Sequence, residues 1–396
     1  MQFEFPSSQW YKHSSAKSHN RAIRYETYTD VTKVKEGSLI HFFEHPNNAA
    51  IPRIIGLSCA TAAGAAPLGL WLKLKKGAPA FNLLGPRLPE DIERIYHQKK
   101  LAGELWAVNE FFKPNALAAL SPLANLLRGH ITDGVVTATI KGVEVKMPIN
   151  NGSEVGQEPA HLHGLAYALT PKTETFIAPD RAELRAHFAS GYNAKFWAGQ
   201  LKLDVTHTLK NAGYEFHMKT TNSGERAIPA GAGAQLHLFS LSQDPSALKL
   251  FIPAGKVLEI DNNENQLATG RLLEIEKDSE LDFNLPHGKT LGSEYFDHLW
   301  VDLELNSAGF AYIDFIDEKA PLRVRLTATT PNIKGIQVSA PQGDHRSALG
   351  IFATIAFVTH LPDPREEVWG DIDTGMKLLK PGESLEYGFR IEIFAS

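Results

Sequence analysis

The chain has 396 residues, of which 43% are hydrophobic and 21% are charged, a composition typical of globular proteins rather than disordered or fibrous ones. Its formal net charge of −5 contains no long run of one sign, which argues against a surface for nucleic acid or an anionic membrane and favours a neutral small molecule as partner. Cys59 is the only cysteine, so no disulfide can form within the chain. A buried thiol and a reducing, cytoplasmic location are expected.

The N-terminal third predicts strands and a few short helices. The first residues, MQFEFPSSQWYKHSS, lack the basic start and continuous apolar stretch of an export signal, so we expect no export. The run Ile54 to Leu74 is apolar, but its glycines and proline make it a poor membrane span and predict core strands with a turn. Alanine and leucine at helical spacing predict short helices over Pro89 to Lys99 and Leu101 to Leu127, covering one end of the molecule.

From Gly134 onward, short runs rich in β-branched and aromatic residues alternate with turn residues, which is typical of an all-β fold. Two hairpins are predicted, each with a glycine in its turn; they join Val135 to Ile140 with Val143 to Met147, and Gln200 to Leu209 with Tyr214 to Thr221. The alternating segment Leu385 to Ile393 predicts a final strand inside a sheet. Since no composition break marks a boundary, we expect one domain over residues 1–396.

Several motifs occur in an order that carries a resemblance. The first is Ala160-His161-Leu162-His163-Gly164, which follows a predicted hairpin. The strongest blocks lie further on: Ala268-Thr269-Gly270-Arg271-Leu272-Leu273, Leu291-Gly292, Phe296-Asp297-His298, Leu361-Pro362-Asp363 and Trp369-Gly370-Asp371. With these blocks the chain resembles the aldose 1-epimerase (galactose mutarotase-like) family from about Leu123 to its end, and more faintly over Ala65 to Leu84. Residues 1–122 match least.

The resemblance implies a galactose mutarotase-like β-supersandwich that binds a sugar. His161 and His163 have no third ligand at diagnostic spacing, so neither a metal nor a cofactor is expected. The resemblance places Arg128, His163 and Asp297 at positions that contact sugar hydroxyls in the family. A histidine before glycine can equally be a loop residue that hydrogen-bonds the backbone. Trp197, Phe239 or Trp300 is a candidate to stack on the apolar face of the ring, with core packing as the alternative for each.

Mutarotation opens and recloses the sugar ring, so one group must take a proton from the anomeric hydroxyl and another must give one to the ring oxygen. The family uses a glutamate and a histidine, and the resemblance puts Phe357 and Gln235 at those two positions. Phenylalanine cannot move a proton, while the glutamine amide can only hydrogen-bond a hydroxyl. Gln235 is therefore expected to bind substrate.

Two substitutes for the missing groups are considered. His237 lies two residues after Gln235, so on an extended strand it points to the same face and is a candidate acid; the alternative is an ordinary strand histidine. Asp363, in the loop after the strand, is the candidate base, with His360, Glu366 and Glu367 as neighbours. For these loop groups the alternative is a solvated charge.

Three functions are compatible with these residues. The first is an aldose 1-epimerase-like isomerase that interconverts the anomers of a hexose or related sugar. The second is a carbohydrate-binding or regulatory protein on the same scaffold, as Phe357 and Gln235 suggest. The third, a lyase or hydrolase, needs paired carboxylates and finds only Asp297 well placed. One fold can have several functions, so the fold alone does not choose among these three. The chain is expected to be a monomer or a homodimer.

Overall fold

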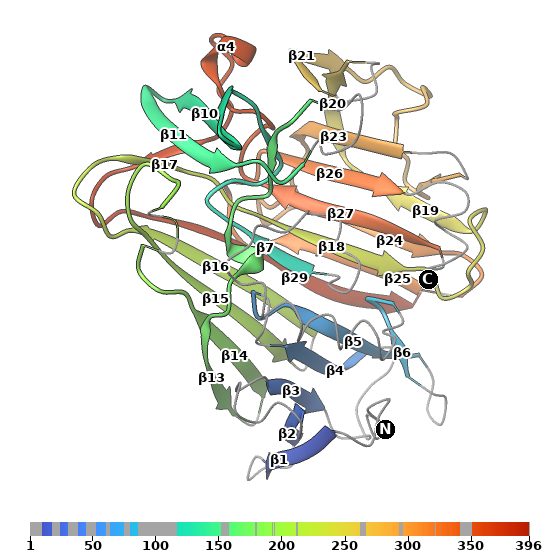
Figure 1. Cartoon of the computed structure of the whole chain (residues 1–396). Coiled ribbons are helices and arrows are strands. Elements are labelled where there is room, and N and C mark those ends of the chain that lie inside the picture. Colours follow the sequence, from blue (N-terminus) through green and yellow to red (C-terminus); the bar gives the residue numbers. More distant parts are fainter. Residues whose placement is uncertain are drawn as a thin grey trace.

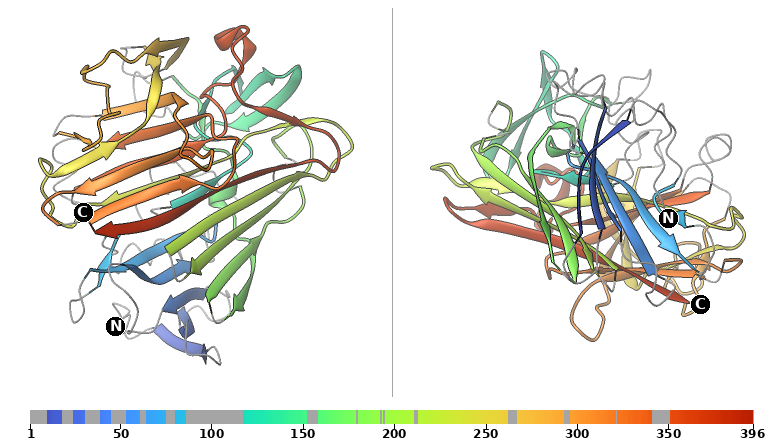
Figure 2. Two further views of the ribbon diagram at one scale, coloured as in Figure 1. Left: turned by 180° about the vertical axis from the view of Figure 1, so that it is seen from behind. Right: turned by 90° about the horizontal axis from the view of Figure 1, so that it is seen from below.

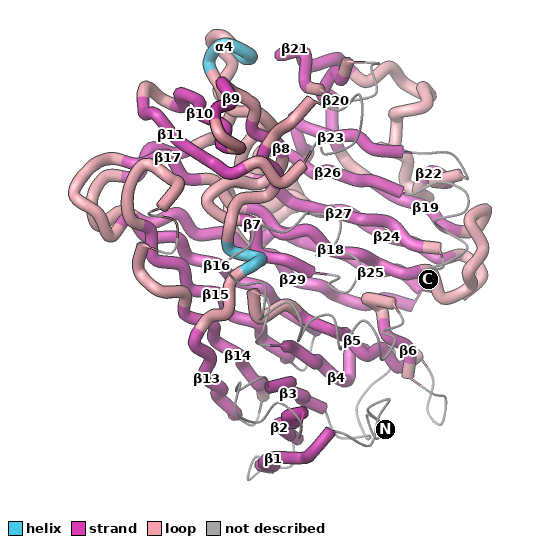
Figure 3. Tube along the Cα trace, viewed as in Figure 1, coloured by secondary structure: helices cyan, strands magenta, loops and turns pink. Residues whose placement is uncertain are grey.

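A computed structural model of the chain is built almost entirely of β-strands (Figure 1). It describes residues 10–17, 24–30, 39–44, 53–60, 64–74, 80–85, 117–151, 158–178, 180–191, 193, 195–210, 213–261, 267–292, 296–320, 322–340 and 351–395. Within these ranges, helix is confined to one 3-10 turn, Ala166–Ala168, and one α-helical turn, α4 (Glu366–Trp369) (Figure 3). The all-β prediction is confirmed.

The larger sheet has nine strands in the order β13-β14-β15-β16-β29-β25-β24-β19-β22. Their bounds are β13 Lys172–Ile177, β14 Arg181–His187, β15 Leu201–Lys210, β16 Gly213–Asn222, β19 Leu248–Phe251, β22 Lys289–Thr290, β24 Tyr312–Asp317, β25 Leu322–Ala328 and β29 Ser384–Ala395. Strands β15 and β16 form the predicted second hairpin, and β29 pairs with β16 and β25 as an interior strand. From behind, β15, β16 and β29 run side by side (Figure 2).

The second sheet has seven strands in the order β21-β20-β23-β26-β27-β18-β7. Their bounds are β7 Leu117–Leu120, β18 Gly233–Phe239, β20 Ala254–Ile260, β21 Ala268–Glu274, β23 Phe296–Leu303, β26 Gly335–Ala340 and β27 Phe352–Val358. Its interior strand β27 reads Phe-Ala-Thr-Ile-Ala-Phe-Val and is buried throughout. Such a continuous apolar run is what a strand covered on both faces requires.

A third, six-stranded sheet is formed by the N-terminal strands in simple order: β1 Trp10–Lys17, β2 Arg24–Asp30, β3 Leu39–Glu44, β4 Arg53–Ala60, β5 Pro67–Lys73 and β6 Phe81–Asn82. Strands β4 and β5 confirm that the apolar run Ile54 to Leu74 makes core strands. Within the described residues, no helix has the length and apolarity needed to cross a bilayer. Cys59 is fully buried in this sheet, as predicted, and its burial raises the pKa of the thiol well above the usual range.

The main core lies between the two large sheets. Phe357 on β27 meets Phe389 on β29 edge to face, with ring centroids 6.2 Å apart, a favoured aromatic geometry. The Tyr387 hydroxyl on β29 donates a hydrogen bond of 3.0 Å to the carbonyl oxygen of Phe357. Alternate residues of a strand face opposite sides. The residues directly before and after Phe357 on β27 therefore face away from the nine-stranded sheet.

Smaller pieces of sheet accompany the two large sheets, and the pair that contains Leu162 borders that outer face of the seven-stranded sheet. They are the hairpin β10 (Val135–Ile140) and β11 (Val143–Pro148) with β9 (His130–Thr132), the pair β8 (Leu126–Leu127) and β12 (His161–Leu162), and the pair β17 (Ile228–Ala230) and β28 (Lys377–Leu379). Strands β10 and β11 confirm the first predicted hairpin. The hairpin and α4 lie next to each other at one end of the molecule (Figure 1).

The predicted helix over Leu101 to Leu127 is wrong in its last third. Residues Leu117–Leu120 form β7, which pairs with β18, and Leu126–Leu127 form β8. A short run of alanine and leucine is compatible with a helix or a strand. Here it forms a strand because it can pair with the backbone edge of β18. The rest of that segment, and the helix predicted over Pro89 to Lys99, lie outside the described residues.

Candidate functional site

The floor of the candidate site is the outer face of the seven-stranded sheet. Strand pairing sets two rows of side chains across β18, β27, β26 and β23. The first row contains Gln235, Ala356, Gln337 and Leu299, and the second contains His237, Thr354, Ser339 and Asp297. Neighbouring strands are ~4.8 Å apart, so Gln235 and Asp297 stand on opposite sides of a hollow roughly three strands wide.

The hollow exists because β27 presents small side chains on this face. Thr354, Ala356 and Val358 line a pocket of about 220 Å³, whereas Ile355 and Phe357 of the same strand point into the core. We call this cavity the ring pocket. It is lined by Leu120, Asn125, Leu162, His163, Gln235, Asp297, Gln337, Ser339, Thr354, Ala356 and Val358.

The wall of the ring pocket comes from the β8 and β12 pair. Asn125 and His163 flank these strands, and both have left-handed backbone, with φ of 72° and 69°. At the next position, a side chain on Gly164 would put its Cβ 2.5 Å from the carbonyl oxygen of Ser121. Glycine therefore lets the chain turn tightly here, so that His163 reaches the pocket while His161 is buried behind it.

A chain of polar groups runs round the ring pocket. The Gln337 side-chain amide donates to the Asp297 carboxylate, and the Asn125 amide donates to the Gln337 oxygen at 3.4 Å. The backbone N–H of Asn125 donates to Nδ1 of His163 at 3.0 Å, and the His163 ring also hydrogen-bonds Gln235. Donors and acceptors from five segments distant in sequence are thus fixed around one cavity.

His163 is held as a neutral imidazole. Burial, together with the smaller effect of nearby His161, lowers its pKa to about 3, and only the hydrogen bond to Gln235 acts in the opposite direction. Because Nδ1 accepts the Asn125 N–H, the single proton of the neutral ring is on Nε2. The ring therefore carries no positive charge, and its single donor, Nε2–H, has Gln235 as its partner.

A second cavity of about 180 Å³, which we call the side pocket, adjoins the first. The two share Asn125, Leu162, Asp297 and Gln337. The rest of the side pocket is lined by Leu126, Asn151, Leu258, Ile260, Ala268, His298, Leu299, Pro362 and Asp363. Asp297 therefore stands at the boundary between the two compartments.

Asp363, the candidate base, borders the side pocket but is committed to ion pairs. Its carboxylate is 1% exposed and accepts hydrogen bonds from Arg128 Nε at 2.8 Å and from Arg365 Nε and Nη2 at 2.7 and 2.8 Å. Arg128 also approaches Glu158 at 3.6 Å and lines neither pocket. This geometry fits a structural role for both Asp363 and Arg128, and their predicted roles in catalysis and sugar contact stay predictions.

The other predicted proton-transfer residues lie around the site rather than in it. His237 faces the same side of the sheet as Gln235, as expected from their spacing, but its ring packs on Phe352 at 5.2 Å and lines neither pocket. His360 is fully buried, accepts the Ala124 N–H at 2.9 Å and donates to the Leu361 carbonyl. Glu366 and Glu367 are exposed on α4.

Phe357 stands on the wrong face of β27 for any contact with the ring pocket. It is 1% exposed in the core. A shift of one residue in matching this strand to the family pattern would bring Ala356 or Val358 to the pocket, and neither is ionisable. In the described part of the chain, β27 therefore supplies the ring pocket with no carboxylate.

The three aromatic residues considered as stacking platforms are core residues instead. Trp197, Phe239 and Trp300 are 3%, 4% and 0% exposed, and none lines either pocket. The indole N–H groups of the two tryptophans donate to backbone carbonyls of Pro229 and Leu281. Burial of large aromatic surface accounts for these positions, so the core-packing alternative holds for all three.

Four polar residues of the ring pocket were not predicted from the sequence: Asn125, Thr354, Gln337 and Ser339. For the last two a signal existed, because Gln337 and Ser339 alternate with apolar Ile336, Val338 and Ala340 along β26. Asn125 carried no such signal. Its importance comes from a backbone turn that brings it against two other segments.

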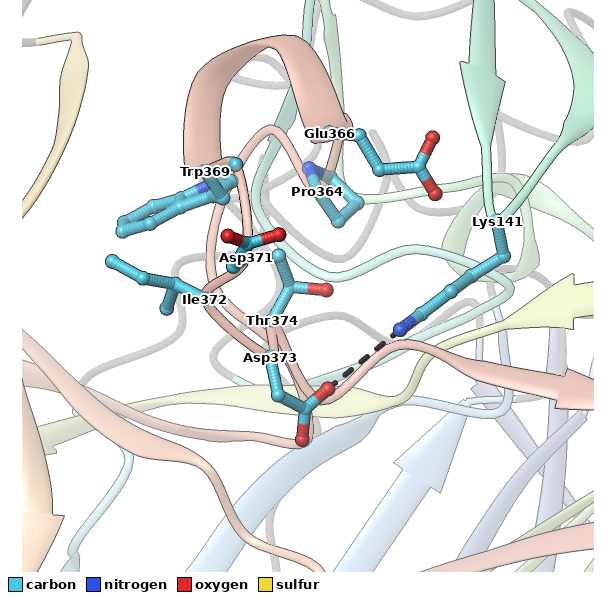
Figure 4. Close-up of a pocket in the computed structure, with 9 residues that line it drawn as sticks. Lys141, Pro364, Glu366, Trp369, Asp371, Ile372, Asp373 and Thr374 are labelled. Carbon is cyan, nitrogen blue, oxygen red and sulfur yellow. Dashed lines mark ion pairs between the residues drawn. The ribbon is translucent and has the colours of Figure 1, made fainter.

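A third hollow, of about 270 Å³, lies between the β10–β11 turn and the loop after α4 (Figure 4). Lys141 extends towards Asp373, with 3.7 Å between nitrogen and oxygen, and Trp369 lies on the side opposite Lys141. Glu366 and Asp371 add two further carboxylates to its lining. Among the described residues, no group of three or more histidine, cysteine, aspartate or glutamate side chains is arranged to hold a metal ion.

A comparison with family models matches residues 131–392 to the family described as aldose 1-epimerase. This interval is more than half of the chain and contains every strand of the two large sheets except β7 and the last three residues of β29. No curated protein matches the sequence at a significant level.

Solved structures share the fold at low identity. A galactose mutarotase-like protein from Clostridium acetobutylicum is 16% identical, with a TM-score of 0.65 over 91% of this chain and 96% of that one. A galactose 1-epimerase from Lactobacillus acidophilus is 15% identical, with a TM-score of 0.61 over 94% and 99%. The aldose epimerase homologue from C. elegans is 16% identical, with a TM-score of 0.60 over 88% and 98%. With the family model covering both large sheets and the fold shared along most of its length, the chain belongs to the aldose 1-epimerase family.

Proposed function

We propose that the ring pocket binds a neutral pyranose sugar and that the protein acts on its anomeric centre as an aldose 1-epimerase-like isomerase. The observation that carries the proposal is the chain of hydrogen-bonded polar groups around a cavity whose floor consists of small side chains. Asp297 and Gln235 stand on opposite sides of that floor, with His163 above it. Convergent polar groups around an apolar surface are what a ring of hydroxyls needs.

Within the ring pocket the ionisable side chains are Asp297 and His163. We therefore assign Asp297 the role of accepting the proton of the anomeric hydroxyl. His163 presents Nε2–H, and because its pKa is about 3 the ring is uncharged near neutral pH. We expect a bound sugar to take the place of Gln235 as the partner of this donor, so that His163 stabilises developing charge on the ring oxygen by a hydrogen bond. Because the neutral ring is not a strong acid, turnover should be slow.

Sugar binding without turnover is the second candidate function. One observation favours it: the cleft-facing residues of β27 are Thr354, Ala356 and Val358, so this strand offers no proton acceptor. Gln235 likewise cannot serve as an acid near neutral pH. Both candidates require the same ligand in the same cavity, and only catalysis separates them.

The test follows optical rotation of freshly dissolved α-glucose and α-galactose with the purified protein, alongside calorimetry with the same sugars. Binding with a rate above buffer supports the isomerase, and Asp297→Asn should then remove the rate. Binding at the buffer rate supports the second candidate. If no sugar in a hexose and pentose panel binds, both functions are contradicted.

A further inference from the structure

Two consecutive backbone amides in the wall of the ring pocket are each bound by a histidine ring. The N–H of Ala124 donates to Nε2 of His360 at 2.9 Å, and the N–H of Asn125 donates to Nδ1 of His163 at 3.0 Å. Ala124 and His360 are both fully buried. His360 lines neither pocket, so its contact is with the wall and not with a ligand.

The hydrogen-bond partners of each ring fix its tautomer. Nδ1 of His360 lies 2.7 Å from the carbonyl oxygen of Leu361, which can only accept, so this nitrogen carries the proton and Nε2 is the acceptor. His163 is the reverse, since its Nδ1 accepts and its proton is on Nε2, where Gln235 is the partner. Each ring keeps its tautomer only while the amide opposite its acceptor nitrogen stays in place.

The backbone of Gly231 packs directly against the ring of His360. A Cβ at this glycine would lie 2.1 Å from Cδ2 and 2.5 Å from Nε2 of the imidazole, so a larger residue would displace the ring. The N–H of Gly231 also donates to the carbonyl oxygen of Pro122 at 2.6 Å, two residues before Ala124. The imidazole is therefore held between this backbone and the amide that it binds.

The loop that carries His360 holds the wall on both sides of Asn125. His360 binds the amide of the residue before it, and the N–H of Asp363 donates to the carbonyl oxygen of Leu126, the residue after it, at 2.7 Å. Asn125 itself has left-handed backbone, with φ of 72°. Such a conformation costs energy and persists where the surrounding contacts impose it, and these two hydrogen bonds are such contacts.

We propose that His360 is a positioning residue for the ring pocket: it fixes the amide of Ala124, and through the same turn the amide of Asn125 that sets the tautomer of His163. This inference rests on the proposed function, because a fixed tautomer keeps the Nε2–H of His163 available to a bound sugar. Without an acceptor from His360, the buried N–H of Ala124 has no partner. The turn must then shift to find one, and His163 loses the contact that confines its proton to Nε2.

Nitrogen spectra of histidine-labelled protein test this without any sugar. At neutral pH the proton of His360 should be on Nδ1 and that of His163 on Nε2. His360→Leu removes the acceptor and should give a mixture of His163 tautomers. His360→Gln, whose side-chain oxygen can reach the place of Nε2, should keep the single form. His207→Leu is the matched control and should leave His163 unchanged, because it removes a similarly buried imidazole from β15, outside both pockets.

Calorimetry with glucose and galactose measures the consequence for binding. We expect His360→Leu to bind sugar roughly tenfold more weakly than the unaltered protein, about what one hydrogen bond contributes, and the other two variants to bind like the unaltered protein. Thermal melts check that each variant folds. If His360→Leu does not fold, Gly231→Ala, which displaces the imidazole and leaves its chemistry intact, should give the same mixture of His163 tautomers.

The proposal is overturned if the unaltered protein carries the His360 proton on Nε2, or if folded His360→Leu keeps the original His163 spectrum. It is also overturned if His360→Gln or His207→Leu changes that spectrum as much as His360→Leu does, since general loss of stability then explains the effect. An unchanged sugar affinity in His360→Leu overturns it as well. Absence of sugar binding to the unaltered protein contradicts the proposed function instead, and the spectra still decide whether His360 sets the tautomer of His163.

Discussion

At the scale of single residues, the site is defined by how hydrogen bonds fix the state of each side chain. His163 accepts a backbone N–H at Nδ1, and burial lowers its pKa to about 3. We expect its imidazole to remain neutral and protonated on Nε2 from pH 8 down to pH 5. Nitrogen chemical shifts of labelled histidine, with His163→Gln to assign the signal, measure this directly. A titration with its midpoint near 6.5 would contradict the assignment.

Asp363 supports the wall of the side pocket through its two arginines. Asp363→Asn removes a carboxylate that is 1% exposed and leaves Arg128 and Arg365 without their shared partner. Breaking a buried ion pair in this way costs about 3 kcal/mol of unfolding free energy. Urea unfolding measures the loss.

Glu367 provides the matched control for that substitution. It contacts the same Arg365 at 3.0 Å but is 81% exposed. An exposed pair contributes at most about 1 kcal/mol, so Glu367→Gln should have little effect. Equal effects of the two variants would show that the buried pair does not stabilise this wall.

At the scale of elements, β21 is placed by a close contact with α4. Gly270 has φ of +84°, and a Cβ there would lie 2.0 Å from the carbonyl oxygen of Val368. Gly270→Ala should therefore cost more than the ~1 kcal/mol of left-handed backbone alone, because α4 or β21 must move. Urea unfolding reports the change in unfolding free energy.

Gly309 separates backbone strain from contact. Its φ is +81°, nearly that of Gly270, but nothing lies within 4 Å of the position where a Cβ would be. Gly309→Ala should then show only the backbone cost. If both variants lose the same stability, the contact between β21 and α4 is not tight.

At the scale of the whole molecule, buried histidines make stability depend on pH. His207 lies on β15, between β14 and β16, and is 1% exposed. Its burial lowers its pKa to about 3. The unfolded chain, with a histidine pKa near 6.5, binds more protons than the folded one below that value, so unfolding becomes easier as the pH falls. His161 and His360, each with a pKa of about 4, act in the same direction.

The expected loss for His207 alone is about 2 kcal/mol of unfolding free energy between pH 7 and pH 5. His207→Leu should make the decline shallower in urea unfolding at a series of pH values. Phe216→Leu removes a neighbouring ring, 5.3 Å away, that does not titrate. It should lower stability equally at every pH, and an unchanged slope in the histidine variant would contradict this account.

The sequence by itself determined the fold class, the hairpins and the order of the family motifs. Strands such as Leu201–Lys210 and Ser384–Ala395 carry their own period-two pattern, and a turn with glycine fixes a hairpin locally. The family motifs also predicted His163, Gln235 and Asp297 as substrate-binding residues, and all three line the ring pocket. These features depend on neighbours in the chain or on recognisable motifs.

Tertiary structure alone decided the rest. Whether Leu117–Leu120 is helix or strand depended on the free edge of β18, and the burial of Trp197 and Trp300 depended on the sheet packed above them. The partners of Asp363 come from segments some 235 residues apart. Cross-strand register set Ala356 between Gln235 and Gln337, and so created the cavity. Pairing of distant strands is a property of the folded sheet, which no local pattern encodes.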